Sequence, residues 1–224
     1  MEISYSFLIL TAFGLGIRHG FDLDHLATID SITKNMDNQP YLAKAVGFLF
    51  SLGHGLIIIL LSSIIGLGLF KNNFPHWLEG FGDLVSIFFL FTFGISNLYI
   101  TFKQSKTRPI YLKGIFAKYL LTKTTQPLLI VLIGALFALS FDTFTQVSLF
   151  SLEAAAMHSW LFSGILGFIF MFGMMVSDGI NGFLVGVLLT NIHKKSYIIS
   201  KGLGIGIAFF SLVICTMNLI KLIA

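Results

Sequence analysis

The chain has 224 residues, of which 56% are hydrophobic and only 11% are charged. Soluble domains usually carry about 25% charged residues, so a water-soluble fold of this length could not bury so many apolar side chains. We therefore predict an all-α membrane protein that is solvated by the lipid bilayer. The net charge of +4 is modest, and in a membrane protein it reports loop orientation, so we expect no nucleic-acid partner.

Six apolar segments predict a polytopic helix bundle, because a membrane span needs about 20 apolar residues. The first and fifth segments are long and contain glycine and aspartate in their interiors, so we expect each to be a broken pair of helical pieces. The segments are residues 3–33, 45–70, 84–102, 127–150, 160–190 and 202–220.

The basic residues between these segments predict the orientation of the chain. Eleven lysines and arginines lie in the loops after the first, third and fifth segments, and two lie on the opposite side, with Arg18 left aside inside the first segment. Positive loops face the cytoplasm, so both termini of this multi-pass cell-membrane protein are expected outside. The eleven are Lys34, Lys44, Lys103, Lys106, Arg108, Lys113, Lys118, Lys123, Lys194, Lys195 and Lys201, and the two are Lys71 and Lys221.

An internal repeat appears when the chain is compared with itself at an offset of 120 residues, where Gly47–Gly53 matches Gly167–Gly173 and Phe21-Asp22 matches Phe141-Asp142. Three spans per half is an odd number, so the halves would be inverted, as in many secondary transporters. The predicted halves are residues 1–102 and 127–224, joined by a basic cytoplasmic loop at 103–126. Chance matching of sequences rich in glycine and phenylalanine is the alternative.

The first segment contains five ionisable residues, namely Arg18, His19, Asp22, Asp24 and His25. Such groups inside a span cost several kcal/mol unless they are paired or hydrated. A salt-bridge network around Arg18 would explain that arginine and one aspartate, but it would leave the two histidines without a role.

Further ionisable residues lie in three other segments: His54 in the second, Asp142 in the fourth and Asp178 in the fifth. A lone histidine in a membrane is often only hydrogen-bonded to a carbonyl group. Together, however, imidazole and carboxylate groups suit Ni²⁺, Co²⁺ or Zn²⁺, whereas Ca²⁺ and Mg²⁺ prefer oxygen ligands and Cu⁺ prefers sulfur. The sequence therefore predicts one site for a divalent transition-metal ion.

Four motifs in order resemble those of the nickel/cobalt transporter (NiCoT) family. The first is Arg-His-Gly-Phe-Asp-Leu-Asp-His-Leu-Ala-Thr-Ile-Asp from Arg18 to Asp30, which resembles R-H-A-x-D-A-D-H-I-A-A-I-D. The others are Phe50-Ser-Leu-Gly-His54, Leu139-Ser-Phe-Asp-Thr-Phe-Thr145 and the stretch from Gly173 to Gly182. Gln146 and Asn181 stand where the family usually has carboxylates. This difference leaves open which ion is preferred and whether its transport is coupled to protons.

The resemblance implies a secondary-active permease that takes up Ni²⁺ or Co²⁺ by alternating access, with the ion as transported substrate and no cofactor. The predicted metal-handling residues are His19, Asp22, Asp24, His25, His54, Asp142 and Asp178, supported by Thr143, Thr145, Gln146 and Asn181.

Two other functions are the alternatives: an efflux permease of the same family and a metal sensor that does not transport. An enzyme is not expected, because a zinc hydrolase usually needs a glutamate base and Glu2, Glu79 and Glu153 lie outside the predicted spans. The oligomeric state stays open.

Overall fold

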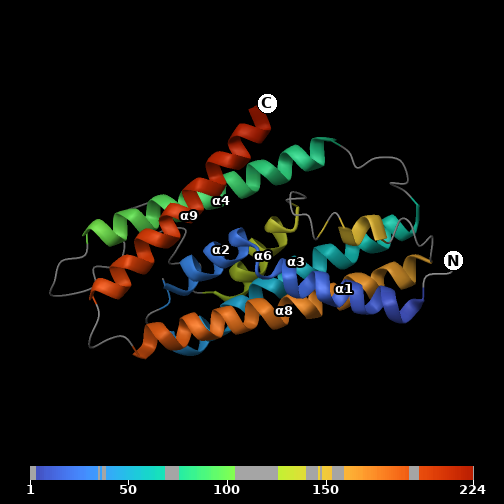
Figure 1. Cartoon of the computed structure of the whole chain (residues 1–224), viewed down its shortest axis with the longest axis horizontal. Helices are drawn as coiled ribbons and strands as arrows, with labels where there is room; N and C mark the ends of the chain where they lie inside the picture. Colours follow the sequence, from blue (N-terminus) through green and yellow to red (C-terminus); the bar gives the residue numbers. More distant parts are fainter. Residues whose placement is uncertain are drawn as a thin grey trace.

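The structure, a computed structural model, describes residues 4–34, 36, 39–68, 76–103, 126–139, 146, 148–152, 159–191 and 197–223. All regular secondary structure in these residues is helical, which confirms the all-α prediction for this part of the chain (Figure 1). The principal helices are α1 (Tyr5–His19), α2 (Leu23–Lys34), α3 (Pro40–Gly66), α4 (His76–Lys103), α6 (Pro127–Phe137), α8 (Trp160–Asn191) and α9 (Tyr197–Ile223).

The first apolar segment is broken, as predicted. The α1 helix ends at His19, the N–H of Asp22 donates to the carbonyl of His19 at 2.9 Å in a turn, and α2 begins at Leu23. The break therefore lies between His19 and Leu23, within the stretch of charged and small residues.

The prediction that the fifth segment is broken is wrong, because α8 is one helix of 32 residues. Its glycines allow close packing instead of unwinding: a Cβ on Gly173 would collide with the carbonyl oxygen of Phe13 in α1. Asp178 is buried within this continuous helix, where side chains of other helices supply its partners.

The fourth segment departs from its prediction as a single span. The α6 helix ends at Phe137 after 11 residues, and a turn follows at Ala138 and Leu139. Helical residues are described again at 148–152. The interrupted segments are therefore the first and the fourth.

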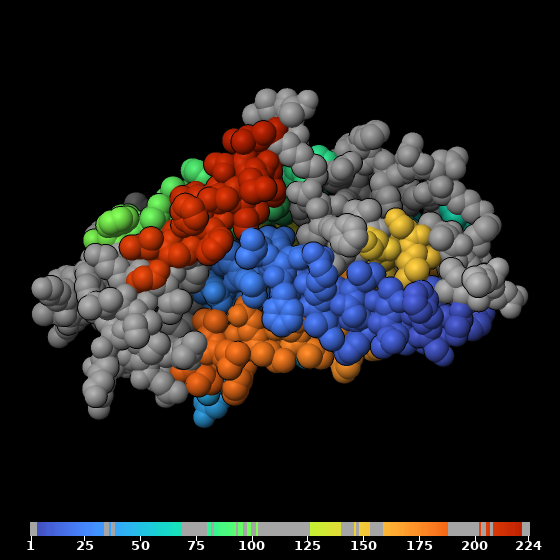
Figure 2. Space-filling view, in the orientation of Figure 1, coloured from blue at the N-terminus to red at the C-terminus, as the bar shows by residue number. Residues whose placement is uncertain are grey.

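Two antiparallel helices, α3 and α8, form the centre of the bundle. The α1 helix packs on α8, α6 packs on α3, and α4 packs on α9 as a separate pair (Figure 1). The short α2 helix contacts α3, α4, α8 and α9 and thus joins the two parts. On the face shown in Figure 2, α1 and α2 lie directly along α8, and α9 covers the edge of α2.

The contact of α1 with α8 has a counterpart in the contact of α6 with α3. A Cβ on Gly16 would collide with the backbone carbonyl of Phe170, and a Cβ on Gly134 would collide in the same way with that of Phe50. Gly134 follows Gly16 by 118 residues, and Phe170 follows Phe50 by 120. The contact of α1 with α8 and that of α6 with α3 are therefore of the same kind, a glycine against a phenylalanine carbonyl.

A second pair of contacts repeats the relation. Gly53 in α3 lies against the backbone of Val131 in α6, and Gly173 in α8 lies against that of Phe13 in α1. Gly173 follows Gly53 by 120 residues, and Val131 follows Phe13 by 118. The second offset is two residues smaller than the offset of 120 at which the sequence matches itself.

The central helices expose apolar side chains and bury a few polar ones among apolar neighbours. In α3, Phe48, Leu56 and Leu60 are exposed, whereas Ser51 and His54 are buried. Within the described chain, Pro40–Gly66 and Trp160–Val187 are long and apolar enough to cross a membrane. An exposed apolar face around buried polar groups is what lipid solvation favours.

The helix ends are sorted between the two ends of the bundle. The C-terminal ends of α4 and α8 and the N-terminal end of α9 lie at the left of Figure 1, and the N-terminal ends of α1 and α8 lie at the right. Most of the predicted basic loop, residues 104–125, lies outside the described residues.

Candidate metal centre

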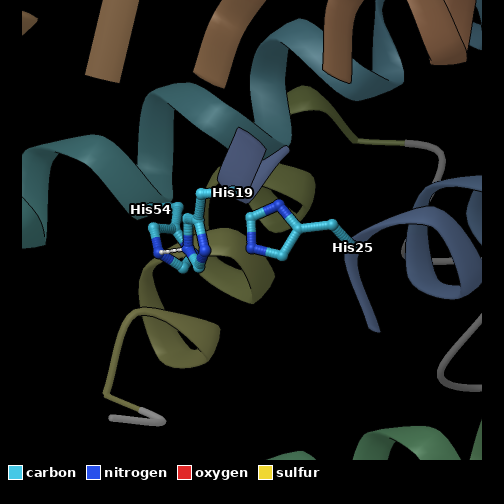
Figure 3. Close-up of side chains that lie close together, drawn as sticks. All are labelled: His19, His25 and His54. Carbon is cyan, nitrogen blue, oxygen red and sulfur yellow. Dashed lines mark hydrogen bonds between the residues drawn. The ribbon is translucent and has the colours of Figure 1, made fainter. Parts of the chain in front are cut away.

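Three buried histidines from three helices face one another in the bundle. His19 is the last residue of α1, His25 lies in the first turn of α2, and His54 lies in the middle of α3. Their ring centroids are 4.5–5.0 Å apart, and one ring nitrogen from each lies within 4.8 Å of the others (Figure 3). The predicted convergence of these imidazoles is present in the structure.

The break between α1 and α2 is what allows His19 and His25 to meet. In a continuous helix, residues six positions apart are separated by about 9 Å along the axis and by about 240° around it. The turn at Gly20 to Asp22 instead directs both rings towards His54. The interruption of the first segment therefore forms the site.

The nitrogen atoms have a spacing that one metal ion can bridge. Nε2 of His19 lies 3.1 Å from Nε2 of His54. Two imidazole nitrogens bound to one first-row ion at about 2.1 Å are about 3.0–3.4 Å apart at octahedral or tetrahedral angles. Nε2 of His25 is buried and has no hydrogen-bond partner among the described residues, so it is available as a third ligand.

Two of the predicted carboxylates contact the other side of these rings. Oδ2 of Asp22 lies 3.0 Å from Nδ1 of His19, and Oδ2 of Asp178 lies 3.0 Å from Nδ1 of His25. A carboxylate that accepts Nδ1–H fixes the ring and its tautomer and leaves the Nε2 lone pair free for metal. The geometry therefore gives Asp22 and Asp178 orienting positions behind the imidazoles.

Asp24 occupies the first turn of α2. Its Oδ1 accepts the backbone N–H of His25 at 2.9 Å, and its side chain is half-buried. A carboxylate there satisfies one of the N–H groups left unpaired at a helix start. Asp24 thus fixes the backbone that carries His25.

The remaining predicted residues are spread over the second half of the chain. Gln146 is buried and donates from Nε2 to the carbonyl of Ala138 at 2.9 Å, which anchors the end of α6. Asn181 lies on α8 one turn after Asp178, and its Nδ2 has no partner within the described residues. Asp142, Thr143 and Thr145 lie outside the described residues.

Ser51 is a further residue of the site, and it was not among the predicted ones. Its hydroxyl lies 2.6 Å from Oδ2 of Asp178. The signal that could have identified it is its position three residues before His54 on α3, which places both side chains on the same face of that helix.

Aromatic rings close the site on two sides. The Phe50 ring lies 5.0 Å from that of His25, and the Phe170 ring lies 5.3 Å from that of His19. His19, His25 and His54 are each at most 1% exposed. The three rings are therefore shielded from solvent, and in such surroundings the attraction between nearby carboxylates and a divalent cation is strong.

A glycine permits α8 to approach the end of α1. A Cβ on Gly20 would collide with Oγ of Ser177 and would lie 3.1 Å from Oδ1 of Asp178. The absence of a side chain at this position keeps Asp178 close to the break in the first segment.

Comparison with known families agrees with this geometry. Residues 5–224 match the NicO family model, described as high-affinity nickel-transport protein. The chain belongs to the NicO family. The resemblance to nickel transporters that the four motifs predicted is confirmed, and the NicO family is one of transport proteins, not of enzymes. With its two long apolar helices, this NicO member is a helical membrane protein.

Several characterised proteins are similar to this NicO chain. It is 30% identical to the nickel transporter NixA of Staphylococcus aureus, over 77% of this chain and 59% of that protein. It is 30% identical to the nickel transporter NicT of Mycobacterium tuberculosis, over 96% and 67% respectively. A match to the cobalt transport protein NhlF of Rhodococcus rhodochrous is 40% identical but covers only 25% of this chain and 16% of NhlF.

The NicO chain spans 59% to 67% of the length of NixA and NicT. No solved structure matches it.

Proposed function

We propose that this chain is a secondary-active permease that takes up Ni²⁺, with Co²⁺ as a second substrate, across the cell membrane. The observation that carries the proposal is the cluster of three buried imidazoles, from α1, α2 and α3, within 4.8 Å of one another. A dication shared between the three rings would be bound by the ring nitrogens that face one another, with the carboxylates behind them holding the rings.

The donor atoms favour a first-row transition metal. Imidazole nitrogen suits Ni²⁺ and Co²⁺, whereas Ca²⁺ and Mg²⁺ prefer oxygen and Cu⁺ prefers sulfur. Asp22 and Asp178, each bonded to one of the histidines, would offset the two positive charges of the ion. The name of the NicO family and the names of NixA and NicT favour nickel, and that of NhlF adds cobalt.

Uptake is the direction that we propose. A high-affinity site, as the NicO description states, is suited to collecting a scarce ion from outside, whereas an exporter works on an ion that has accumulated. Efflux and metal sensing without transport remain the alternatives to be tested.

The position of the site suits alternating access. His54 is the fifteenth of 27 residues in α3, and Asp178 is the nineteenth of 32 in α8, so the site lies near the middle of both helices. Secondary transporters bind their substrates at this depth, between inverted repeats and beside interrupted helices.

We propose that the chain has six spans arranged as inverted halves, residues 1–102 and 127–224, joined by the basic segment 103–126. The reciprocal contacts of Gly16 with Phe170 and of Gly134 with Phe50 support the two-fold relation. The ends of α4, α8 and α9 next to the predicted cytoplasmic loops lie together, which supports cytoplasmic basic loops and external termini.

The experiment that tests the function is metal uptake into liposomes that contain only this chain. We expect saturable Ni²⁺ uptake by the parent and its loss when His19, His25 or His54 is replaced by alanine. The affinity for Ni²⁺ should fall at least about 10-fold in each variant. Loss of a residue that only orients a metal ligand usually weakens binding by about that much, and loss of the ligand itself should weaken it more. The control is His76→Ala at the first residue of α4, which should transport normally.

The outcomes separate the alternatives. Uptake that persists in all three variants would refute the site. Tight Ni²⁺ binding without any uptake would favour the sensor. If transport occurs only when the metal is supplied on the side of the liposome membrane that the cytoplasmic loops face, the result would favour efflux.

A further inference from the structure

One hydroxyl group from α3 reaches the carboxylate that holds His25. Oγ of Ser51 lies 2.6 Å from Oδ2 of Asp178 and 2.9 Å from the carbonyl oxygen of Gly47. A serine hydroxyl has one proton, so it donates to one of these acceptors at a time. A distance of about 2.5–2.7 Å is typical of an O–H donor facing a carboxylate, which assigns the proton to Asp178.

Oδ2 of Asp178 therefore accepts two hydrogen bonds from two different helices, from Ser51 in α3 and from Nδ1 of His25 in α2. The side chains of all three residues are at most 1% exposed. Oδ1 of the same carboxylate has no hydrogen-bond donor within the described residues. Among the described residues, two hydrogen bonds thus restrain rotation of the carboxylate: the one from His25 and the one from Ser51.

We propose that Ser51 is a positioning residue of the ion site. Its hydroxyl holds Oδ2 of Asp178 in place, Asp178 holds Nδ1 of His25, and Nε2 of His25 is thereby directed towards His19 and His54. The inference rests on the proposed function only in requiring that His25 binds the ion. Ser51 does not touch the ion.

The alternative role for Ser51 is an ordinary helix-internal bond to Gly47. Ser63 shows what that role looks like on the same helix, because its Oγ donates to the carbonyl of Ile59 at 2.8 Å, also four residues back, and it bonds to no carboxylate within the described residues. Ser63→Ala therefore removes the same kind of bond and the same atom without affecting Asp178. It is the matched control.

The test is the dissociation constant for Ni²⁺ of the purified full chain, measured by isothermal titration, together with the thermal unfolding temperature of the metal-free protein. Ser51→Ala should weaken Ni²⁺ binding about 10-fold, the usual size for loss of a group behind a metal ligand. Ser63→Ala should leave the constant within about two-fold. Ser51→Thr retains the hydroxyl and should restore binding to within about three-fold of the parent.

Three results would overturn the role of Ser51: parent-like affinity in Ser51→Ala, an equal loss in Ser51→Thr, or an equal loss in Ser63→Ala. If Ser51→Ala is not recovered folded, Ser51→Cys replaces it, because a thiol is of similar size but a weak donor: a loss of about 10-fold supports the role and parent-like affinity contradicts it. A parent that binds no Ni²⁺, or a His25→Ala variant that binds like the parent, would instead refute the proposed function.

Discussion

Replacing Asp178 by asparagine tests whether the carboxylates behind the histidines control the affinity for metal. The substitution retains the shape of the side chain and removes its charge. Asp178 accepts hydrogen bonds from His25 at 3.0 Å and from Ser51 at 2.6 Å. An asparagine either accepts these bonds as a neutral oxygen or turns its NH₂ group towards two donors.

The expected loss follows from the two bonds. A hydrogen bond to a charged group contributes about 1.5–3 kcal/mol, and one between neutral groups contributes about 0.5–1.5 kcal/mol. Loss of the charge therefore removes about 1 kcal/mol for each bond, or about 2 kcal/mol in total. Since about 1.4 kcal/mol corresponds to a factor of ten, Asp178→Asn should weaken Ni²⁺ binding about 30-fold.

The assay is isothermal titration of Ni²⁺ into the purified chain, with Asp83→Asn as the control. Asp83 is also buried, but it lies in α4, a helix that contributes none of the three histidines, so its replacement should change affinity less than about three-fold. Parent-like affinity in Asp178→Asn, or an equal loss in Asp83→Asn, would show that the contact with His25 does not govern binding.

Two further predictions concern the break and the orientation. Gly20→Ala should weaken Ni²⁺ binding at least about 10-fold, because the new methyl group collides with Ser177 beside the site. Gly14→Ala, within α1, meets no atom within 4 Å and should bind normally. Equal affinities of the two variants in titration would contradict this packing. The single native cysteine is buried, so introduced cysteines can be labelled selectively. A membrane-impermeant maleimide should label Asn73→Cys in intact cells and Lys113→Cys only after permeabilisation, and the reverse pattern would refute the proposed topology.

Much of the candidate site could be predicted from the sequence because its ionisable residues are conspicuous in apolar segments. The break in the first segment followed from the charges around Gly20, and the meeting of His19, His25 and His54 followed from the unfavourable burial of imidazoles in lipid. These features depend on local sequence or on a general physical requirement.

The details that failed depend on contacts distant in sequence. The aspartate in the fifth segment predicted a broken helix, but Asp178 has its partners in His25 and Ser51, which are 153 and 127 residues away. Paired in this way, the carboxylate can remain in a continuous helix. The glycines of α8 also favoured the prediction of a break, because only the packed structure shows the neighbouring backbones that they accommodate.

The continuous α8 helix has a consequence for how the protein moves. At about 1.5 Å per residue its 32 residues extend over about 48 Å, whereas the hydrocarbon core of a bilayer is about 30 Å thick. With neither a proline nor an interruption along its length, α8 behaves as a stiff rod that protrudes from the hydrocarbon layer or crosses it at a steep tilt. In the proposed transport cycle, a displacement of Asp178 would therefore move both ends of this helix and link closure around the ion on one face of the membrane to the opposite face.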